Sequence, residues 1–155
     1  MVNNIENMPH FGAIDESLEE EQALLMRARL HVRGGWIRFS EGRTRDAIAA
    51  IYDALSSSMQ IFSIPNTSGR ILKIAEGEDP SDDLALFKIL KRSGVFDDSV
   101  SLEDFMYIAQ SLDDALENRL AGFDETRFVE TTNRLFIQLG VLPFDACALP
   151  DSITL

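Results

Sequence analysis

The stretch DAIAAIYDALSSSMQIF, residues 46–62, carries apolar side chains at the spacing of an amphipathic α-helix. Intervals of three and four residues separate these side chains and put them on one helix face: Ile48, Ile51, Tyr52, Leu55, Met59 and Phe62. Pro65 follows closely, and a proline ends rather than continues a helix. The stretch therefore predicts one helix with a single apolar face, which has to be buried against neighbouring helices.

Comparable patterns on both sides of this stretch predict its neighbours. Upstream, apolar residues recur with the helical period from Leu24 to Phe39, and Gly35 falls in the same stripe. Downstream, Ser101 and Asp104 have the spacing of a capping box, with Asp in place of the usual Glu or Gln. We expect these additional helices at residues 15–41, 84–93, 102–120 and 125–139, with a short helical piece at 68–75.

The fold class that these patterns predict is all-α. Runs that alternate β-branched and polar residues are missing, as are Asn-Gly and Asp-Gly hairpin turns. Because the connections are short, consecutive helices should be antiparallel. We expect an antiparallel up-and-down bundle of four to five helices over residues 15–140, a flexible N-terminal arm at 1–14 and an irregular C-terminal tail at 141–155. The predicted core includes Ile48, Ile51, Tyr52, Leu55, Phe105, Leu112, Phe128 and Leu135.

The composition limits the expected location and partners. The net charge of −12 disfavours binding to nucleic acid, because phosphates would be repelled overall. The sequence has no apolar run long enough for a transmembrane helix and no secretory pattern at its N-terminus. Cys147 is the only cysteine, which fits a reducing compartment. We therefore expect a cytoplasmic protein that does not enter a membrane.

The charges are distributed unevenly along the chain. Residues 22–75 carry eight Lys and Arg against three acids, whereas residues 76–155 carry six against 17. Either the later acidic helices neutralise the basic segment internally, or the segment forms an exposed patch for an anionic ligand or an acidic partner. Exposed ion pairs contribute only about 0–1 kcal/mol each. This favours the second explanation, with a protein partner or a homodimer contact through the first two helices.

Motifs for catalysis and for cofactor binding are missing. His10 and His31 are the only histidines, and neither stands in a Glu-x-x-His or His-Glu-x-x-His motif, which excludes a di-iron bundle and a zinc hydrolase of the known kinds. The sequence has no glycine-rich phosphate-binding loop. A lone cysteine is more often an inert apolar residue than a nucleophile. We therefore expect no metal, no cofactor and no enzymatic activity.

The segment EGRTRDAIAAIYDALSSSMQIF, residues 41–62, resembles the second helix of HEPN-family proteins. In that family a Gly, a basic and acidic pair, Asp-Ala-Ile and an aromatic-Asp/Tyr-Ala turn recur in this order. The resemblance implies an up-and-down bundle that often forms dimers. It also implies a function either together with a nucleotidyltransferase or as a toxin ribonuclease. The ribonuclease branch uses an Arg-x(4–6)-His motif on a late helix, and this sequence has no histidine after His31. The resemblance therefore implies a non-catalytic member.

One group of residues on the first predicted helix is a candidate binding site. Arg27, His31 and Arg38 project within about 40° of one another, at positions i, i+4 and i+11. Two arginines can pair with the charge of a phosphate, and the bare backbone of Gly34 and Gly35 would leave room for it. The group therefore predicts an anion or nucleotide site, with a half-packed structural histidine as the alternative.

His31 also has a second interpretation. His31 followed four residues later by Gly35 resembles the phosphoacceptor helix of histidine phosphotransfer bundles, although those proteins have a Lys where this chain has Gly34. That role requires an imidazole exposed to solvent. The leading functional hypothesis is a non-catalytic, HEPN-like interaction or nucleotide-binding accessory module, and the alternative is a histidine phosphotransfer domain with His31 as phosphoacceptor.

Overall fold

A computed structural model of the chain describes residues 19–65 and 71–150. Five α-helices form in these ranges: α1 (Glu20–Ser40), α2 (Thr44–Ile61), α3 (Asp83–Arg92), α4 (Leu102–Leu116) and α5 (Glu125–Gln138), followed by a short 3-10 helix, η2 (Ala146–Ala148). The described ranges contain no β-strand. The prediction of an all-α bundle is therefore confirmed. The predicted arm at residues 1–14 lies outside the described residues.

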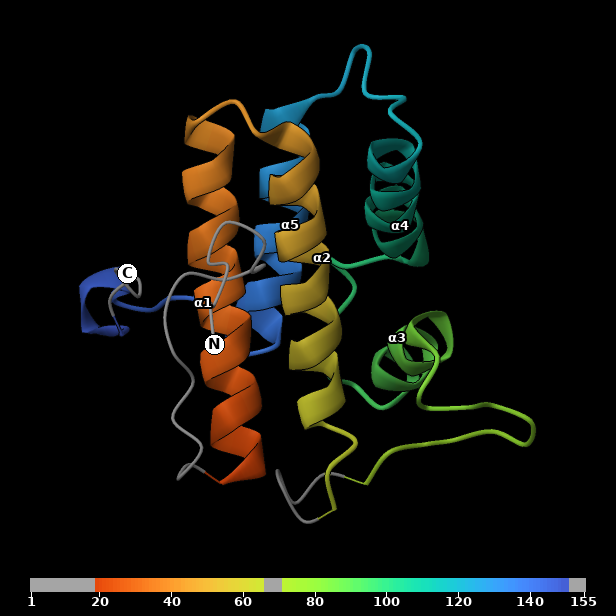
Figure 1. Ribbon diagram of the computed structural model, residues 1–155. Helices are drawn as coiled ribbons and strands as arrows, with labels where there is room; N and C mark the ends of the chain where they lie inside the picture. Colours follow the sequence, from red (N-terminus) through yellow and green to blue (C-terminus); the bar gives the residue numbers. More distant parts are fainter. Residues whose placement is uncertain (1–18, 66–70, 151–155) are drawn as a thin grey trace, which may run out of the picture.

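The α2 helix occupies the centre of the bundle and contacts each of the other four helices (Figure 1). Helices α1 and α2 form a long antiparallel hairpin, and α5 lies behind it. Helix α4 lies on the other side of α2 and runs opposite to both α2 and α5, so that α1, α2, α4 and α5 alternate in direction. The short α3 helix packs below α4 against the lower half of α2. This arrangement leaves α4 on the outside of the bundle.

The predicted capping box at the start of α4 is present. The Ser101 hydroxyl oxygen accepts from the Asp104 N–H at 3.2 Å, and an Asp104 carboxylate oxygen accepts from the Ser101 N–H at 2.9 Å. The same helix ends earlier than the predicted Leu120. Asn118 adopts a left-handed φ of 56°, and the Arg119 N–H donates to the Asp114 carbonyl at 2.7 Å, which closes the helix after Leu116.

The short helix predicted at residues 68–75 is wrong over its described part, because residues 71–75 are irregular. Side chains from α3 hold this segment through its main chain. The Lys73 N–H donates to the Ser93 hydroxyl at 2.8 Å, and the Arg92 guanidinium donates to the Lys73 carbonyl at 2.7 Å. Arg92 also forms a two-point ion pair with Glu78, at 2.6 and 2.9 Å. These contacts satisfy the main-chain groups without a helix.

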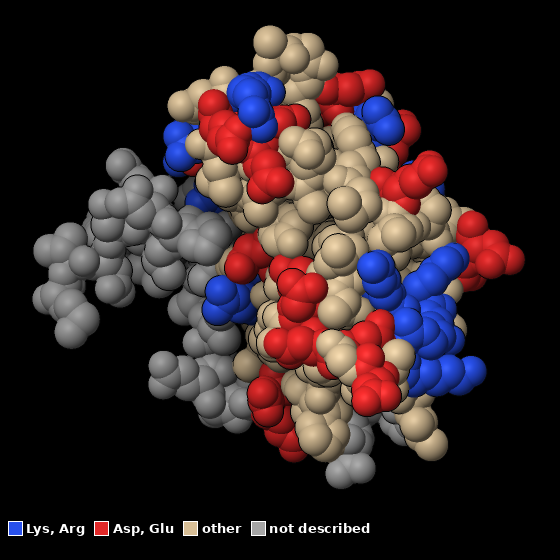
Figure 2. All heavy atoms as spheres, turned by 90° about the vertical axis from the view of Figure 1, so that its right-hand side faces the viewer, with Lys and Arg blue, Asp and Glu red and all other residues tan. Residues whose placement is uncertain are grey.

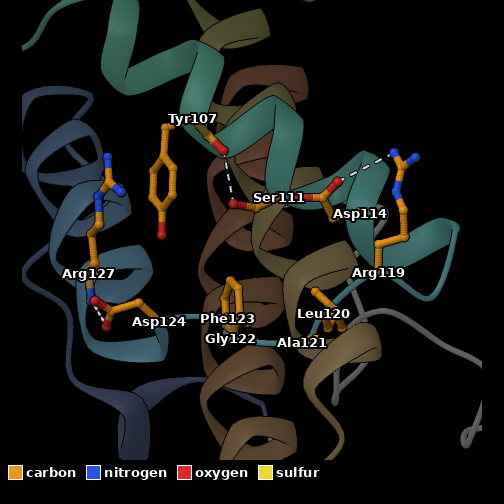
Figure 3. Close-up of a pocket in the computed structure, with 10 residues that line it drawn as sticks. All are labelled: Tyr107, Ser111, Asp114, Arg119, Leu120, Ala121, Gly122, Phe123, Asp124 and Arg127. Carbon is orange, nitrogen blue, oxygen red and sulfur yellow. Dashed lines mark hydrogen bonds and ion pairs between the residues drawn. The ribbon is translucent and has the colours of Figure 1, made fainter.

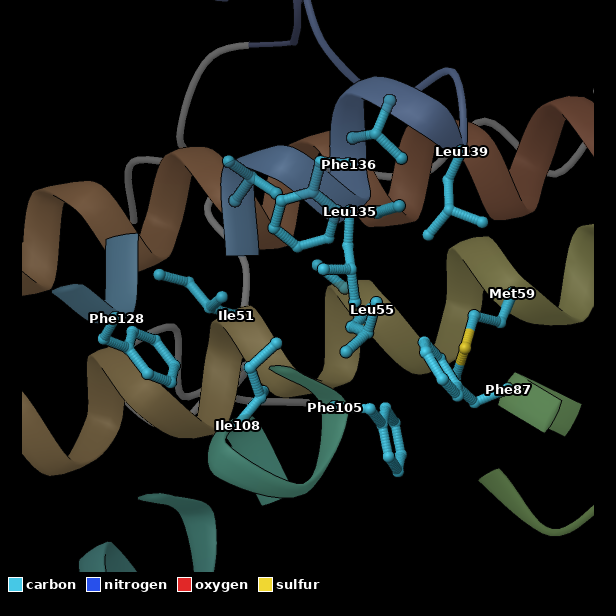
Figure 4. Close-up of a cluster of buried hydrophobic side chains, with 14 of the residues drawn as sticks. Ile51, Leu55, Met59, Phe87, Phe105, Ile108, Phe128, Leu135, Phe136 and Leu139 are labelled. Atoms are coloured by element: carbon cyan, nitrogen blue, oxygen red, sulfur yellow. The ribbon is translucent and has the colours of Figure 1, made fainter. Parts of the chain in front are cut away.

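The core lies between α2 and the helices around it, where apolar side chains from several helices meet (Figure 4). Six of the eight residues predicted for the core are buried: Ile48, Ile51, Leu55, Phe105, Phe128 and Leu135. The other two, Tyr52 and Leu112, are half-buried and pack against it. The aromatic rings of Phe87 and Phe105 stack at a centroid distance of 5.0 Å. The helical period therefore identified the buried faces of these helices correctly.

Gly35 lets α1 and α2 approach closely. A Cβ atom at this position would lie 2.5 Å from the Ile51 Cγ1 atom and 3.3 Å from the Ala47 carbonyl oxygen. The absence of a side chain at Gly35 therefore permits this close packing. The close approach brings the polar side chains on the neighbouring faces of the two helices into contact.

Candidate functional site

The three residues of the predicted anion site do not form one open group. His31 is fully buried, and its Nδ1 atom contacts the Oδ2 atom of Asp53 on α2. The Arg27 Nη2 atom donates to the same carboxylate oxygen at 3.4 Å. Arg38 lies two helical turns beyond His31, roughly 10 Å further along the axis of α1. Two of the three residues therefore converge on an internal carboxylate of the protein.

The electrostatics of Asp53 show that this contact favours the charged carboxylate. Partial burial alone would raise the pKa of Asp53, but the hydrogen bond and the charge of His31, with the charge of Arg27, outweigh it and lower that pKa. The Asp53 side chain is 37% exposed, so water still reaches one side of it. The contacts of Asp53 with His31 and Arg27 thus join α1 to α2 at the edge of the core.

The burial of His31 bears directly on the phosphotransfer hypothesis. A phosphoacceptor histidine has to present a ring nitrogen to a second protein, and the His31 imidazole has no exposed surface. One of its two nitrogens already contacts Asp53. The described structure therefore lacks the accessible imidazole that phosphotransfer requires.

Arg38 is buried too, with only 2% of its surface exposed. Burial lowers the pKa of its guanidinium, and the positive charge of Arg43 adds to this effect, while Asp46 and Glu41 oppose it. A buried guanidinium of this kind cannot serve as an open contact for a nucleotide phosphate. Arg27 alone among the three predicted residues is substantially exposed, with 43% of its side chain accessible.

Two further arginines of the basic segment hold the C-terminal part of the chain against α1. Arg29 donates to the carbonyl oxygens of Val141 and Gly140, at 3.0 and 3.2 Å. Arg33 donates to the carbonyl oxygens of Ala146 and Pro150, at 3.3 and 2.5 Å. These contacts are hydrogen bonds to neutral main-chain groups. These main-chain contacts explain part of the clustering of arginines. Neither explanation drawn from the sequence, internal neutralisation by acidic helices or an exposed basic patch, included this role.

Two more arginines of this segment, Arg43 and Arg45, lie at the start of α2. Arg43 pairs with Asp46 at 3.0 Å, one helical turn away. Arg45 is exposed and makes no ion pair with any residue in the described ranges. The first two helices therefore present fewer available cations than the sequence suggests.

A small polar pocket of about 190 Å³ lies between the C-terminal half of α4 and the start of α5 (Figure 3). The Arg127 guanidinium stacks over the Tyr107 ring, 4.0 Å from its centroid. Burial raises the pKa of Tyr107, while the charge of Arg127 acts in the opposite direction. Arg119 on the other side pairs with Asp114 and Glu117, at 3.5 and 2.5 Å. The pocket is smaller than typical ligand sites, which enclose roughly 300–1,000 Å³. Its two arginines already contact other residues of the pocket, since Arg119 pairs with Asp114 and Arg127 stacks on Tyr107.

Helix α4 carries three of the large apolar side chains that the fold leaves exposed. Leu102, Met106 and Leu116 are exposed by 43%, 48% and 54%. With 3.6 residues per turn they project within about 80° of one another, and the half-buried Ala109 lies between them. Leu116 lies one helical turn after the half-buried Leu112, a spacing that favours the core side of the helix, but its side chain is exposed. We call Leu102, Met106, Ala109 and Leu116 the α4 stripe.

Acidic side chains lie within the α4 stripe and along one side of it. Residues 102–117 contain five Asp and Glu and no Lys or Arg. Asp104 pairs with Arg134 at 3.3 Å, whereas Glu103 and Asp113 are exposed and make no ion pair with the described residues. On the face that carries α3 and α4, uncharged surface lies between groups of acidic side chains, and Lys and Arg gather at one edge (Figure 2).

The acids at the end of α4 do not help the helix to form. The last turn of α4 contains no basic residue. A carboxylate there lies near the negative end of the helix dipole, which costs about 0.3–1 kcal/mol for an exposed charge. Asp113 lies in that turn and has no described cation beside it to offset this cost. The stability of α4 therefore does not explain the presence of a carboxylate at Asp113.

No protein-family model matches the chain, and no curated protein or solved structure is significantly similar to it. Within the described ranges, every helix is too short or too polar to cross a lipid bilayer. The same ranges contain no group of three or more His, Cys, Asp and Glu that could hold a metal ion. The case for a function therefore rests on the surfaces of the bundle itself.

Proposed function

We propose that this chain is a non-catalytic interaction module that binds another protein through the α4 stripe. One observation carries the proposal. Of the seven large apolar side chains that are exposed in the described ranges, three lie on one face of the 15-residue α4 helix. Single exposed apolar residues need no explanation, but several of them on one face of a helix are typical of a protein-binding surface.

Two further points support an interaction module over the other hypotheses. The resemblance of residues 41–62 to the HEPN family agrees with a role beside a partner protein. The anion-binding and homodimer hypotheses relied on free basic side chains on the first two helices. Arg29 and Arg33 are held by main-chain carbonyls, and Arg38 is buried, which leaves those hypotheses with less support.

The test is photo-crosslinking in the cells that naturally produce the protein. A photoreactive amino acid replaces Met106 in one strain and Ile137 in a control strain, because Ile137 is similarly exposed but lies on α5. We expect the probe at position 106 to link one defined protein, which mass spectrometry identifies and which binds again when both proteins are purified. A Leu102→Ser substitution should weaken that binding. No crosslink at position 106, or the same products from both positions, would contradict the proposal.

A further inference from the structure

We infer that the partner segment seated on the α4 stripe is an amphipathic helix with Lys or Arg within its apolar face and along one side of it. This inference rests on the proposed function and specifies the chemistry of the partner. It depends on three features of α4, which are the spacing of its exposed apolar residues, the sign of the charges beside them, and the position of the helix at the edge of the bundle.

The spacing fits a helical partner. Leu102 and Met106 are one turn apart, and Leu116 lies near the other end of the same helix, so the stripe runs along the full length of α4. Neighbouring helices α2, α3 and α5 pack against the buried side of α4. A helix laid along the open side would pack as a further member of the bundle, with its own apolar residues at intervals of three and four.

The charges indicate a basic partner. Asp113 projects within the stripe and Glu103 about 60° beyond Met106 on one side of it, and both are exposed carboxylates with no described ion-pair partner. A partner with one Lys or Arg within its apolar face and another on the matching side would pair with both carboxylates. It would also place positive charge beside the end of α4, where the helix dipole favours a cation. Complementary charges of this kind steer the encounter and select the correct partner.

The same charges disfavour a second copy of this chain as the occupant. In a two-fold symmetric dimer the same patch contacts itself. Two antiparallel α4 helices would bring Glu103 of one copy towards Asp113 of the other, and each end would meet like charge. Residues 102–117 offer no Lys or Arg to offset this repulsion. The stripe is therefore better suited to a different protein than to self-association.

Helix-stabilised synthetic peptides of the length of α4, 15 residues, provide the test. One peptide carries Leu at helical spacing with Lys both within that face and along one flank of it, and a matched peptide has Glu in place of each Lys. Fluorescence anisotropy measures the Kd of each peptide for the full chain. We expect the Lys peptide to bind at low salt and to weaken as salt rises, and the Glu peptide to bind at least about tenfold more weakly.

Matched variants of the chain locate the binding. Met106→Ser should weaken the Lys peptide about tenfold, and Glu103→Gln/Asp113→Asn should weaken it about fivefold to tenfold. The control substitutions Ile137→Ser and Glu130→Gln, on the exposed face of α5, should leave the Kd unchanged. Circular dichroism melts should show that all four variants are folded.

Three other outcomes would overturn the inference, and they differ in meaning. If both peptides bind equally and Met106→Ser weakens both, the stripe is a protein-binding surface but the basic partner is wrong. If the α4 variants and the α5 variants behave alike, the Lys peptide binds by charge alone and the stripe has no part in it. If sedimentation shows wild-type dimers that Met106→Ser dissociates, the occupant is a second copy of the chain.

Discussion

The Nδ1 atom of His31 on α1 contacts the Oδ2 atom of Asp53 on α2, and so links the two longest helices of the bundle. The imidazole is fully buried, while the carboxylate remains 37% exposed and also contacts Arg27. The carboxylate is therefore partly hydrated, and the buried histidine still has a hydrogen-bonding partner. Such an arrangement is suited to holding a helix pair in register.

We expect Asp53→Asn to destabilise the fold at neutral pH by about 1–3 kcal/mol, because a fully buried histidine loses its charged partner. Urea unfolding followed by circular dichroism measures the change. Asp98→Asn is a matched control, since Asp98 is an exposed acid in the loop before α4 and no hydrogen bond of its side chain is seen in the described structure. The control should stay within about 0.5 kcal/mol of wild type. Equal stabilities for the two variants would show that the contact with His31 does not stabilise the hairpin.

The same variant should change how stability depends on pH. The pKa of Asp53 is lower in the folded protein than in the unfolded chain, so the unfolded chain binds more protons at acidic pH. The stabilisation by Asp53 is therefore complete above its unfolded pKa of about 3.9, and is lost as the pH falls through the lower folded value. Asp53→Asn should show a shallower loss of stability than wild type below about pH 4.

The sequence predicted the bundle well because periodicity reports which side of a helix is buried. Ile51, Leu55 and Phe128 lie in the core as their spacing indicates. The candidate site was less predictable. The contact between His31 and Asp53 depends on how α1 and α2 are placed along one another, which the spacing within either helix does not determine. A buried polar residue opposite an acid on the next helix is a pattern that could have suggested this pair.

Two other features lay beyond the sequence for different physical reasons. The partners of Arg29 and Arg33 are main-chain carbonyls, which any residue can supply, so no residue pattern marks them. The exposure of Leu116 depends on how far the neighbouring helices extend. An apolar residue at a helical interval has the same pattern whether a neighbour covers it or not.

A second prediction concerns the close approach of α1 and α2. Gly35→Ala would gain helix propensity of about 1 kcal/mol, but its Cβ would lie 2.5 Å from Ile51 Cγ1. Ile51 is β-branched and stiff in a helix, so it cannot move aside easily. We expect a net loss of about 1–3 kcal/mol in a denaturant melt.

The control for Gly35→Ala is a double-mutant cycle. Ile51→Ala removes the Cγ1 atom that the new methyl group would meet. In that background Gly35→Ala should cost less, and the coupling between the two substitutions should be favourable. Strictly additive losses would show that close packing at Gly35 does not limit the approach of the helices.

A third prediction concerns Tyr52, which ties α2 to the start of α3. Its hydroxyl donates to an Asp83 carboxylate oxygen at 3.0 Å, and Ser56 donates to the other oxygen at 2.8 Å. Burial and the neighbouring carboxylate raise the pKa of Tyr52. The stabilisation is therefore present at every pH below the unfolded pKa of about 10, and is lost as the pH rises above it.

Tyr52→Phe should therefore be less stable than wild type at neutral pH, and its stability should fall less steeply above about pH 10. Urea melts at a series of alkaline pH values measure the difference. Tyr107→Phe is a useful comparison, because Tyr107 is the only other tyrosine and its ring lies against Arg127 and Phe128 of α5. If Tyr52→Phe follows the wild-type curve at every pH, the contact with Asp83 does not contribute.

The last prediction concerns the C-terminal segment on α1. Trp36 is the only tryptophan of the chain, and its ring stacks on Phe144 with a centroid distance of 5.7 Å and an angle of 6° between the planes. Phe144→Ala should expose the indole and shift its fluorescence emission to longer wavelength, whereas Ile137→Ala on α5 should not. Arg33→Ala should produce a similar shift, because the segment loses its hydrogen bonds to the Arg33 guanidinium. An unchanged emission spectrum in both Phe144→Ala and Arg33→Ala would show that this segment does not cover the indole.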